Sequence, residues 1–101
     1  MAATTLGPVT VQLAIDLAAI VSAAQRGARV AWLNDDRVGY GTARSIGDEG
    51  GGFARFDEDI RNCHLRVTTD LGFELFVPMS DVLARYADGT FVLDPTEQVR
   101  A

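Results

Sequence analysis

Cys63 and His64 are adjacent in the chain, and a thiol beside an imidazole is the pair that cysteine-dependent enzymes use as nucleophile and base. The surrounding segment, 61–69, alternates between apolar and polar residues, as a strand with one buried face does. Neighbouring residues of a strand point to opposite faces, so we expect a buried thiol and an exposed imidazole that cannot share a hydrogen bond. The pair therefore predicts a structural cysteine, and we expect no catalytic residue and no enzymatic activity.

Metal and cofactor chemistry has little support in the residue types. One cysteine and one histidine are too few for a usual zinc site, and the absence of lysine excludes Schiff-base catalysis. The carboxylates around the glycine run 50–52 lack the ordered spacing of a calcium loop, and their charge repels phosphate. They are Asp48, Glu49, Asp57, Glu58 and Asp59. We expect a solvated acidic loop, no metal and no cofactor.

Two groups of residues are candidates for binding. Phe53 and Phe56 lie next to the glycines, and aromatic side chains near arginine are typical of protein interfaces. We predict charged contacts from Arg61 and Arg66 at the rim of such an interface. The second group would share a polar strand face suited to a small ligand or a nucleic acid. Its members are Tyr40, Arg44, His64 and Arg66.

The net charge favours a protein partner. Fourteen acidic and nine basic residues give a formal charge of -5 at pH 7. Such a field repels phosphate backbones and anionic lipid surfaces. We therefore expect another protein or a second copy of this chain as the partner, no membrane partner, and a disfavoured role for nucleic acid.

The length of 101 residues and the 48% hydrophobic content fit one compact domain. We expect it to span 8–94, between a flexible N-terminus, 1–7, and a C-terminal tail, 95–101. The apolar stretch 9–24 is interrupted by polar residues, and no positive charge precedes it, so we expect neither a signal peptide nor a spanning helix. A cytoplasmic location follows from this pattern and from the single cysteine.

Residues 8–27, which we call the leader, fit two secondary structures. Apolar residues alternate over 8–15 as in a strand, and apolar residues also recur at helical spacing along the leader. We expect a strand over 8–15 and a helix from Leu17 to about Arg26. One continuous helix from Thr10 fits almost equally well.

If residues 8–15 form a strand, Asp16 is the N-cap of the helix that follows. With either structure of the leader, Gly27 ends the helix in a left-handed conformation. The leader then has two apolar faces. One comprises Leu13, Leu17, Ile20, Val21 and Ala24, and the second comprises Ile15, Ala18, Ala19 and Ser22.

The rest of the chain predicts short strands joined by turns. Strand 28–33 and return strand 37–46 form a hairpin around the turn 34–36, and Gly39 and Gly41 leave one face bare for a ring or another backbone. The return strand is expected to place one set of side chains on its other face: Val38, Tyr40, Thr42, Arg44 and Ile46. Strands 61–69 and 73–77, helix 80–86 capped by Ser80, a turn at Asp88-Gly89 and strand 90–94 follow. The inward residues of the two middle strands are expected to be Cys63, Leu65, Val67, Phe73, Leu75 and Val77.

These elements predict a mainly β fold, a small five- or six-stranded bent barrel or roll with an N-terminal strand-helix leader and a short helix before the last strand. The order of Val38-Gly39-Tyr40-Gly41, Val77-Pro78-Met79 and Gly89-Thr90-Phe91 resembles the PRC-barrel-like family over roughly residues 28–94. The resemblance implies a compact β-barrel that serves larger complexes as a binding or assembly module, without family-wide catalytic residues. The leader and the long triple-glycine loop depart from the family's usual pattern.

The leader carries more apolar surface than a domain of this size covers by itself. We therefore predict homo-oligomerisation or docking on a larger subunit. The predicted contact residues are Ile15, Leu17, Ile20, Val21, Phe53, Phe56, Arg61 and Arg66.

Overall fold

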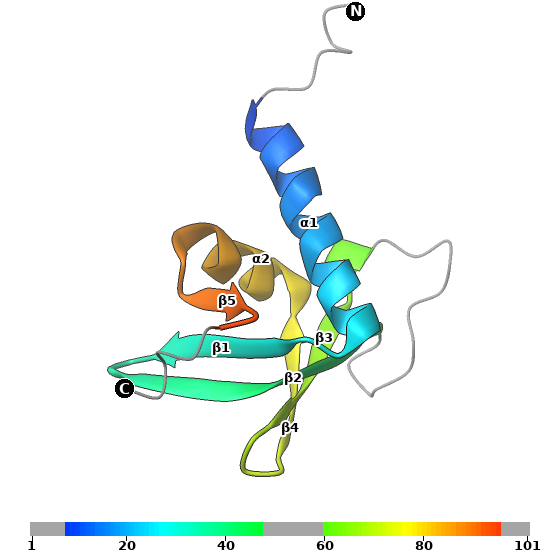
Figure 1. Ribbon diagram of the computed structural model, residues 1–101. Helices are drawn as coiled ribbons and strands as arrows, with labels where there is room; N and C mark the ends of the chain where they lie inside the picture. Colours follow the sequence, from blue (N-terminus) through cyan, green and yellow to red (C-terminus); the bar gives the residue numbers. More distant parts are fainter. Residues whose placement is uncertain (1–7, 48–59, 96–101) are drawn as a thin grey trace, which may run out of the picture.

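The structure is a computed structural model that describes residues 8–47 and 60–95. Its elements are α1 (Pro8–Arg26), β1 (Arg29–Asn34), β2 (Arg37–Gly47), η2 (Ile60–Asn62), β3 (His64–Thr69), β4 (Glu74–Pro78), α2 (Met79–Asp88) and β5 (Phe91–Leu93). The strands form one five-stranded antiparallel sheet in the order β4-β3-β2-β1-β5. Figure 1 shows α1 and α2 on the same side of this sheet.

The predicted mainly β fold is therefore confirmed at the level of a five-stranded antiparallel sheet with two helices. Within the described residues the sheet is open, because β4 and β5 are its two edges and are not paired with each other. The core lies between the sheet and the two helices. Its buried residues include Ile20, Ala24, Val30, Ala43, Leu65, Val67, Met79, Val82, Leu83 and Phe91.

The predicted strand over 8–15 is wrong, because α1 is one continuous helix from Pro8. Helix growth adds one hydrogen bond for each residue, and no glycine or proline interrupts the chain between Val9 and Arg26. A proline in the first helical turn loses nothing, since its missing N–H would have had no partner there. The alternation over 8–15 thus lies on a helix.

Asp16 is not an N-cap but a buried residue in the middle of α1. Gln12 donates a hydrogen bond from Nε2 to Asp16 Oδ1 at 2.8 Å, one helical turn away. The predicted stop at Gly27 is confirmed by its φ of 66°. The N–H of Ala28 donates to the carbonyl of Ala23 at 2.9 Å, which closes the helix as a left-handed glycine cap does.

The predicted hairpin of β1 and β2 is confirmed, with Asn34 paired to Arg37. Its glycines allow the predicted close approaches. A Cβ at Gly39 would lie 2.6 Å from Trp32 Cε2, and a Cβ at Gly41 would lie 2.6 Å from the carbonyl oxygen of Thr68. Only glycine leaves room for both contacts.

The predicted side-chain orientation in β2 is wrong beyond Arg44, because the strand has a β-bulge at this residue. Ala43 pairs with Val67, but Ser45 already pairs with Arg66, so Arg44 is the extra residue. An extra residue reverses the alternation of side chains beyond it. Ile46 therefore packs against the core and not on the face of Tyr40.

The predicted burial of Leu65 and Val67 in β3 is confirmed, and so is that of Cys63, which directly precedes the strand, since each is at most 2% exposed. In the next segment the predicted burial is wrong for Phe73, which is 65% exposed, and Leu75 is 37% exposed. The described part of the two helices does not extend over the far end of this hairpin (Figure 1).

Helix α2 begins at Met79 and not at the predicted Ser80. Pro78 occupies its N-cap position without a side-chain hydrogen bond. Met79 can enter the helix because its own N–H donates to the carbonyl of Cys63 at 2.9 Å. The predicted turn at Gly89 is confirmed, with φ of 84° at the helix end.

Candidate functional site

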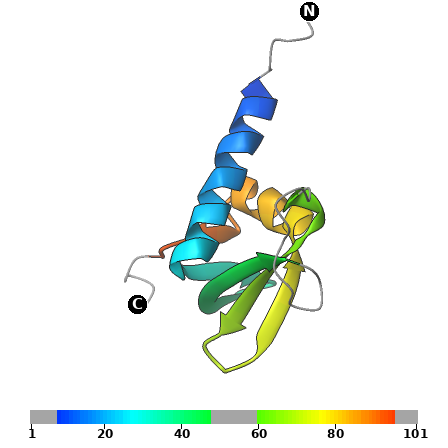
Figure 2. The ribbon, with the colours of Figure 1, turned by 90° about the vertical axis from the view of Figure 1, so that its right-hand side faces the viewer.

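Helix α1 has two halves with different surroundings. In the C-terminal half, Ile20 and Ala23 are fully buried against the body of the domain. In the N-terminal half, Val11 is 41% exposed, Leu13 37% and Ile15 56%. Figures 1 and 2 show these first turns extending beyond the sheet and α2. The apolar N-terminal half of α1 is therefore available for contact with another molecule.

The predicted second apolar face of the leader is exposed, as Ile15, Ala18 and Ser22 show. The opposite face packs on the domain, and three predicted contact residues lie there or at its margin. Ile20 is 0% exposed, so its prediction as a partner contact is wrong. Leu17 packs against the core, and Val21 is half-buried. The reason is helical geometry, which turns residues three and four apart toward one side.

Three of the other predicted contact residues lie wholly or partly outside the described residues. Phe53 and Phe56 lie outside the described residues, and so does the side chain of Arg61, whose backbone is in η2. The fourth, Arg66, lies on the face of the sheet away from the helices. Its guanidinium forms two hydrogen bonds with the carboxylate of Glu74, at 3.2 and 2.5 Å.

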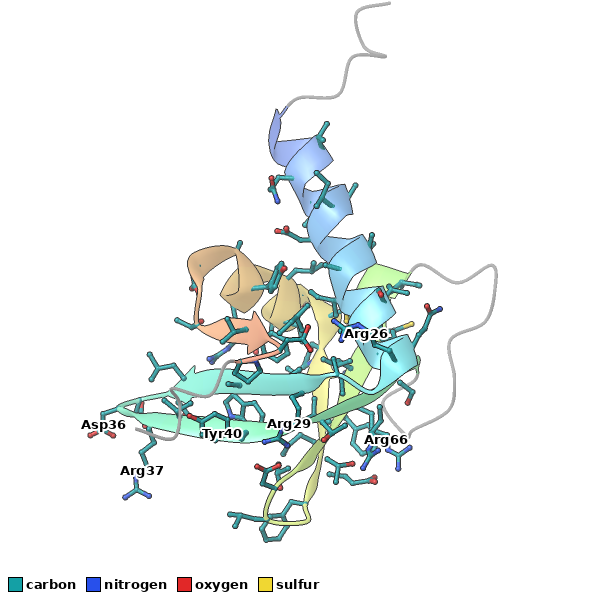
Figure 3. The ribbon with its side chains drawn as sticks, in the orientation of Figure 1. Arg26, Arg29, Asp36, Arg37, Tyr40 and Arg66 are labelled. Atoms are coloured by element: carbon teal, nitrogen blue, oxygen red, sulfur yellow. The ribbon has the colours of Figure 1, made fainter. Side chains whose placement is uncertain are left out.

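The face predicted as an alternative ligand site does not bring all four of its residues together, because Tyr40 lies apart from Arg66. Tyr40 and Arg66 lie at different parts of this face, as Figure 3 shows. Arg44 donates a hydrogen bond to Thr68 Oγ1 at 3.0 Å, while Arg66 is held by Glu74. His64 is half-buried, and its Nδ1 has no hydrogen-bond partner within the described part of the chain.

Carboxylates form ion pairs with two arginines of this face, Arg66 and Arg29. The hydrogen bond from Arg66 lowers the pKa of Glu74, with further Coulomb contributions from Arg66 and Arg44. The hydrogen bond from Arg29 likewise lowers the pKa of Asp70, and the pair is 2.6 Å apart. Both carboxylates are thus charged near neutral pH. The face offers paired ions rather than the row of uncompensated cations that a phosphate backbone requires.

A pocket of about 190 Å³ lies between α2 and the sheet. Its walls are mainly apolar, and the sequence patterns did not indicate it, because it is formed by side chains from several elements. At its rim Arg85 donates to Asp81 Oδ2 at 3.1 Å and to the carbonyl oxygen of Leu33 at 3.0 Å. The lining residues are Trp32, Asn34, Val67, Leu75, Val77, Asp81, Val82, Arg85 and Phe91.

The hairpin of β3 and β4 carries a second group of exposed apolar side chains. Leu71 is 85% exposed, Phe73 65% and Leu75 37%. These residues belong to the outermost hairpin of the sheet, on the side of edge strand β4. Sequence reasoning missed Phe73 and Leu75 because strand alternation placed them on one apolar row, and it assigned Leu71 only to a turn.

Within residues 8–47 and 60–95, no helix is long and apolar enough to cross a membrane. The same residues contain no cluster of three or more histidine, cysteine or acidic side chains that could hold a metal ion.

Comparison of the chain with protein-family models, curated proteins and solved structures found no match.

Proposed function

We propose that this protein is a non-enzymatic protein-binding or assembly module, and that the N-terminal half of α1 is its contact with another protein. One observation carries this proposal: large apolar side chains remain exposed on a helical segment that extends beyond its own domain. Exposed apolar surface of this kind is typical of interaction sites.

The lack of charged side chains in the first turns of α1 favours an apolar surface on the partner. Residues 8–15 contain no charged side chain, and the first charged residue of α1, Asp16, is buried and bonded to Gln12. Covering this segment therefore does not require the desolvation of a charge. Completing the burial of Val11, Leu13 and Ile15 would contribute about 1 kcal/mol for each side chain.

The position of the residues with catalytic potential supports a non-enzymatic role. Cys63 is 2% exposed on the core side of the sheet, and His64 is its direct neighbour in the chain, at the start of β3. Buried thiols of this kind are inert, whereas reactive cysteines are partly exposed. Arg66 and Arg29 are the ion-pair partners of Glu74 and Asp70.

The finer fold assignment is part of the same proposal. The glycine hairpin, the β3–β4 pair ending at Pro78 and the short closing strand β5 follow each other in the order that suggested the PRC-barrel-like family. We therefore propose that the binding module is PRC-barrel-like and acts in the cytoplasm.

The proposal is tested by affinity capture from extracts of the native cell, using the full chain and two charged variants of the helix, Val11→Glu and Ile15→Glu. The matched control is Val38→Glu, which places the same charge at a 52% exposed position of β2. We expect one set of proteins to bind the wild type and the control but neither helix variant. Calorimetry with the captured protein after purification should then show a negative heat-capacity change, as burial of apolar surface requires.

Folding of all variants is checked by circular dichroism. Equal capture by the helix variants, the control and the wild type would refute α1 as the contact.

A further inference from the structure

Edge strand β4 is joined to β3 by a ladder whose two ends are defined by backbone hydrogen bonds. At one end the N–H of Thr69 donates to the carbonyl of Phe73 at 2.7 Å. At the other end the N–H of Met79 donates to the carbonyl of Cys63 at 2.9 Å. In an antiparallel pair, every second residue bonds the neighbouring strand. These two bonds therefore determine which residues of β4 face β3.

By this alternation Leu75 and Val77 direct their backbone groups toward β3, where they pair with Val67 and Leu65. The backbone groups of Glu74 and Phe76 point away from the sheet. Within the described residues no strand lies beyond β4 to receive them.

We infer that β4 pairs antiparallel with β4 of a second copy of this chain, with the two-fold axis between the two Leu75 residues. In this register Glu74 of each copy lies opposite Phe76 of the other. The outward N–H of each of these residues then donates to the outward carbonyl of its counterpart. Pro78, which has no N–H, lies outside the bonded pairs. The edge is self-complementary, and a symmetric contact of this kind is the usual form of a homodimer.

The charges of β4 are compatible with this register. Its only ionisable side chain, Glu74, would lie opposite the ring of Phe76 and not opposite a second carboxylate. Arg66 holds Glu74 within the same copy, so the acid is already compensated. Like charges directly opposite one another would weaken a strand pair, and this arrangement avoids them.

Two of the exposed apolar side chains of the hairpin, Leu75 and Phe73, would lie at the contact in the same pairing. The two Leu75 side chains, each 37% exposed, would face one another across the axis at a close, non-hydrogen-bonded position. Phe73, 65% exposed, would lie opposite Val77 of the second copy, and Val77 lines the pocket under α2. Each phenyl ring would thus lie beside the pocket of the other copy.

Within residues 8–47 and 60–95, β4 itself also lacks the features that keep edge strands apart. Proteins protect exposed edges with lysine, central proline, bulges or very short strands. β4 has Leu75, Phe76 and Val77 at its centre, and its one proline is at its end. The other edge, β5, is only 3 residues long.

This inference is independent of the proposed function, because β4 and the N-terminal half of α1 are different surfaces. A two-fold dimer joined at β4 would present two copies of α1. Variants of α1 should change partner capture without changing the mass of the protein, and removal of an outward N–H of β4 should change the mass.

The first test is disulfide cross-linking of the full chain carrying Leu75→Cys. Across the axis its Cβ atoms would be about 5 Å apart, close to disulfide geometry. The control is Leu71→Cys. Leu71 is 85% exposed, but residue 71 of one copy would be about 25 Å from residue 71 of the other in this register. The wild type, whose only cysteine is the buried Cys63, gives the background. Under mild oxidation we expect a covalent dimer at Leu75→Cys only, and equal rates at both positions would overturn the inference.

The second test is light scattering coupled to size-exclusion chromatography. We expect the wild type to have twice the 10.8 kDa mass of the chain. Phe76→Pro should return it to the monomer mass, because proline removes the N–H that faces the second copy and leaves the ladder to β3 intact. Phe76→Ala keeps that N–H and should remain dimeric. A wild type that stays monomeric at high concentration would overturn the inference, whether or not Phe76→Pro folds.

Discussion

The indole ring of Trp32 lies directly against the backbone of Gly39, its register partner in the β1–β2 hairpin. A Cβ added at Gly39 would be 2.6 Å from Cε2 of the ring, closer than carbon atoms can approach. The hairpin therefore positions the largest side chain of the protein at the pocket under α2. This contact links a glycine pattern visible in the sequence to the packing of the core.

Gly39→Ala is expected to destabilise the protein by about 1–3 kcal/mol, because the added methyl group must displace the Trp32 ring. Urea unfolding followed by circular dichroism measures this change. In a Trp32→Leu background the same substitution should cost much less, since the ring is absent. An equal cost in both backgrounds would show that the ring is not the obstacle.

The substitutions Ile20→Ala and Ile15→Ala should have very different effects on stability, although each truncates an isoleucine of α1. Ile20 is 0% exposed, so its truncation should lower the free energy of unfolding by about 2–5 kcal/mol. Ile15 is 56% exposed, and its truncation should change the free energy of unfolding by less than about 0.5 kcal/mol. Chemical denaturation at a single low protein concentration compares the two. Similar losses would contradict the division of α1 into buried and exposed halves.

Gly89→Ala should destabilise α2 by about 1 kcal/mol, because the residue has φ of 84° in the left-handed region. Space is not the cause, since nothing lies within 4 Å of the position of an added Cβ. Gly89→Asn should cost less, because asparagine tolerates this conformation better than alanine. Thermal unfolding ranks the three proteins, and the order wild type, Asn, Ala is the expected result.

The pairing of Arg66 with Glu74 should make stability depend on pH in the acidic range. The folded-state pKa of Glu74 is lowered from its ordinary 4.5, mainly by the hydrogen bond from Arg66. The folded protein therefore holds fewer protons than the unfolded chain, and the stabilisation is present above the ordinary pKa and lost as pH falls through the lowered one. Glu74→Gln should be less stable than the wild type at pH 7, by an amount that disappears in strong acid.

Because both side chains are solvent-exposed, high salt should also reduce the difference between Glu74→Gln and the wild type. The measurement is urea unfolding at several pH values and two salt concentrations. A difference that stays constant from neutral to strongly acidic pH would exclude the ion pair as its source.

The sequence by itself determined the local features of the fold. The turns at Asn34–Arg37 and Asp88-Gly89, the helix stop at Gly27 and the bare glycine face of β2 were all predicted, because each depends on residues close in the chain. The inward row of Cys63, Leu65 and Val67 followed from alternation alone.

Only the tertiary structure decided which surfaces remain uncovered. The pattern of residues 8–15 fits either a strand or a helix. The segment is helical because the chain continues the helix without a break to Arg26, and no described strand pairs with residues 8–15. The bulge at Arg44 and the exposure of Phe73 depend on how β2, β3 and the helices meet. Burial is a property of contacts between distant segments, so periodicity identifies an apolar face but cannot say whether the same chain covers it.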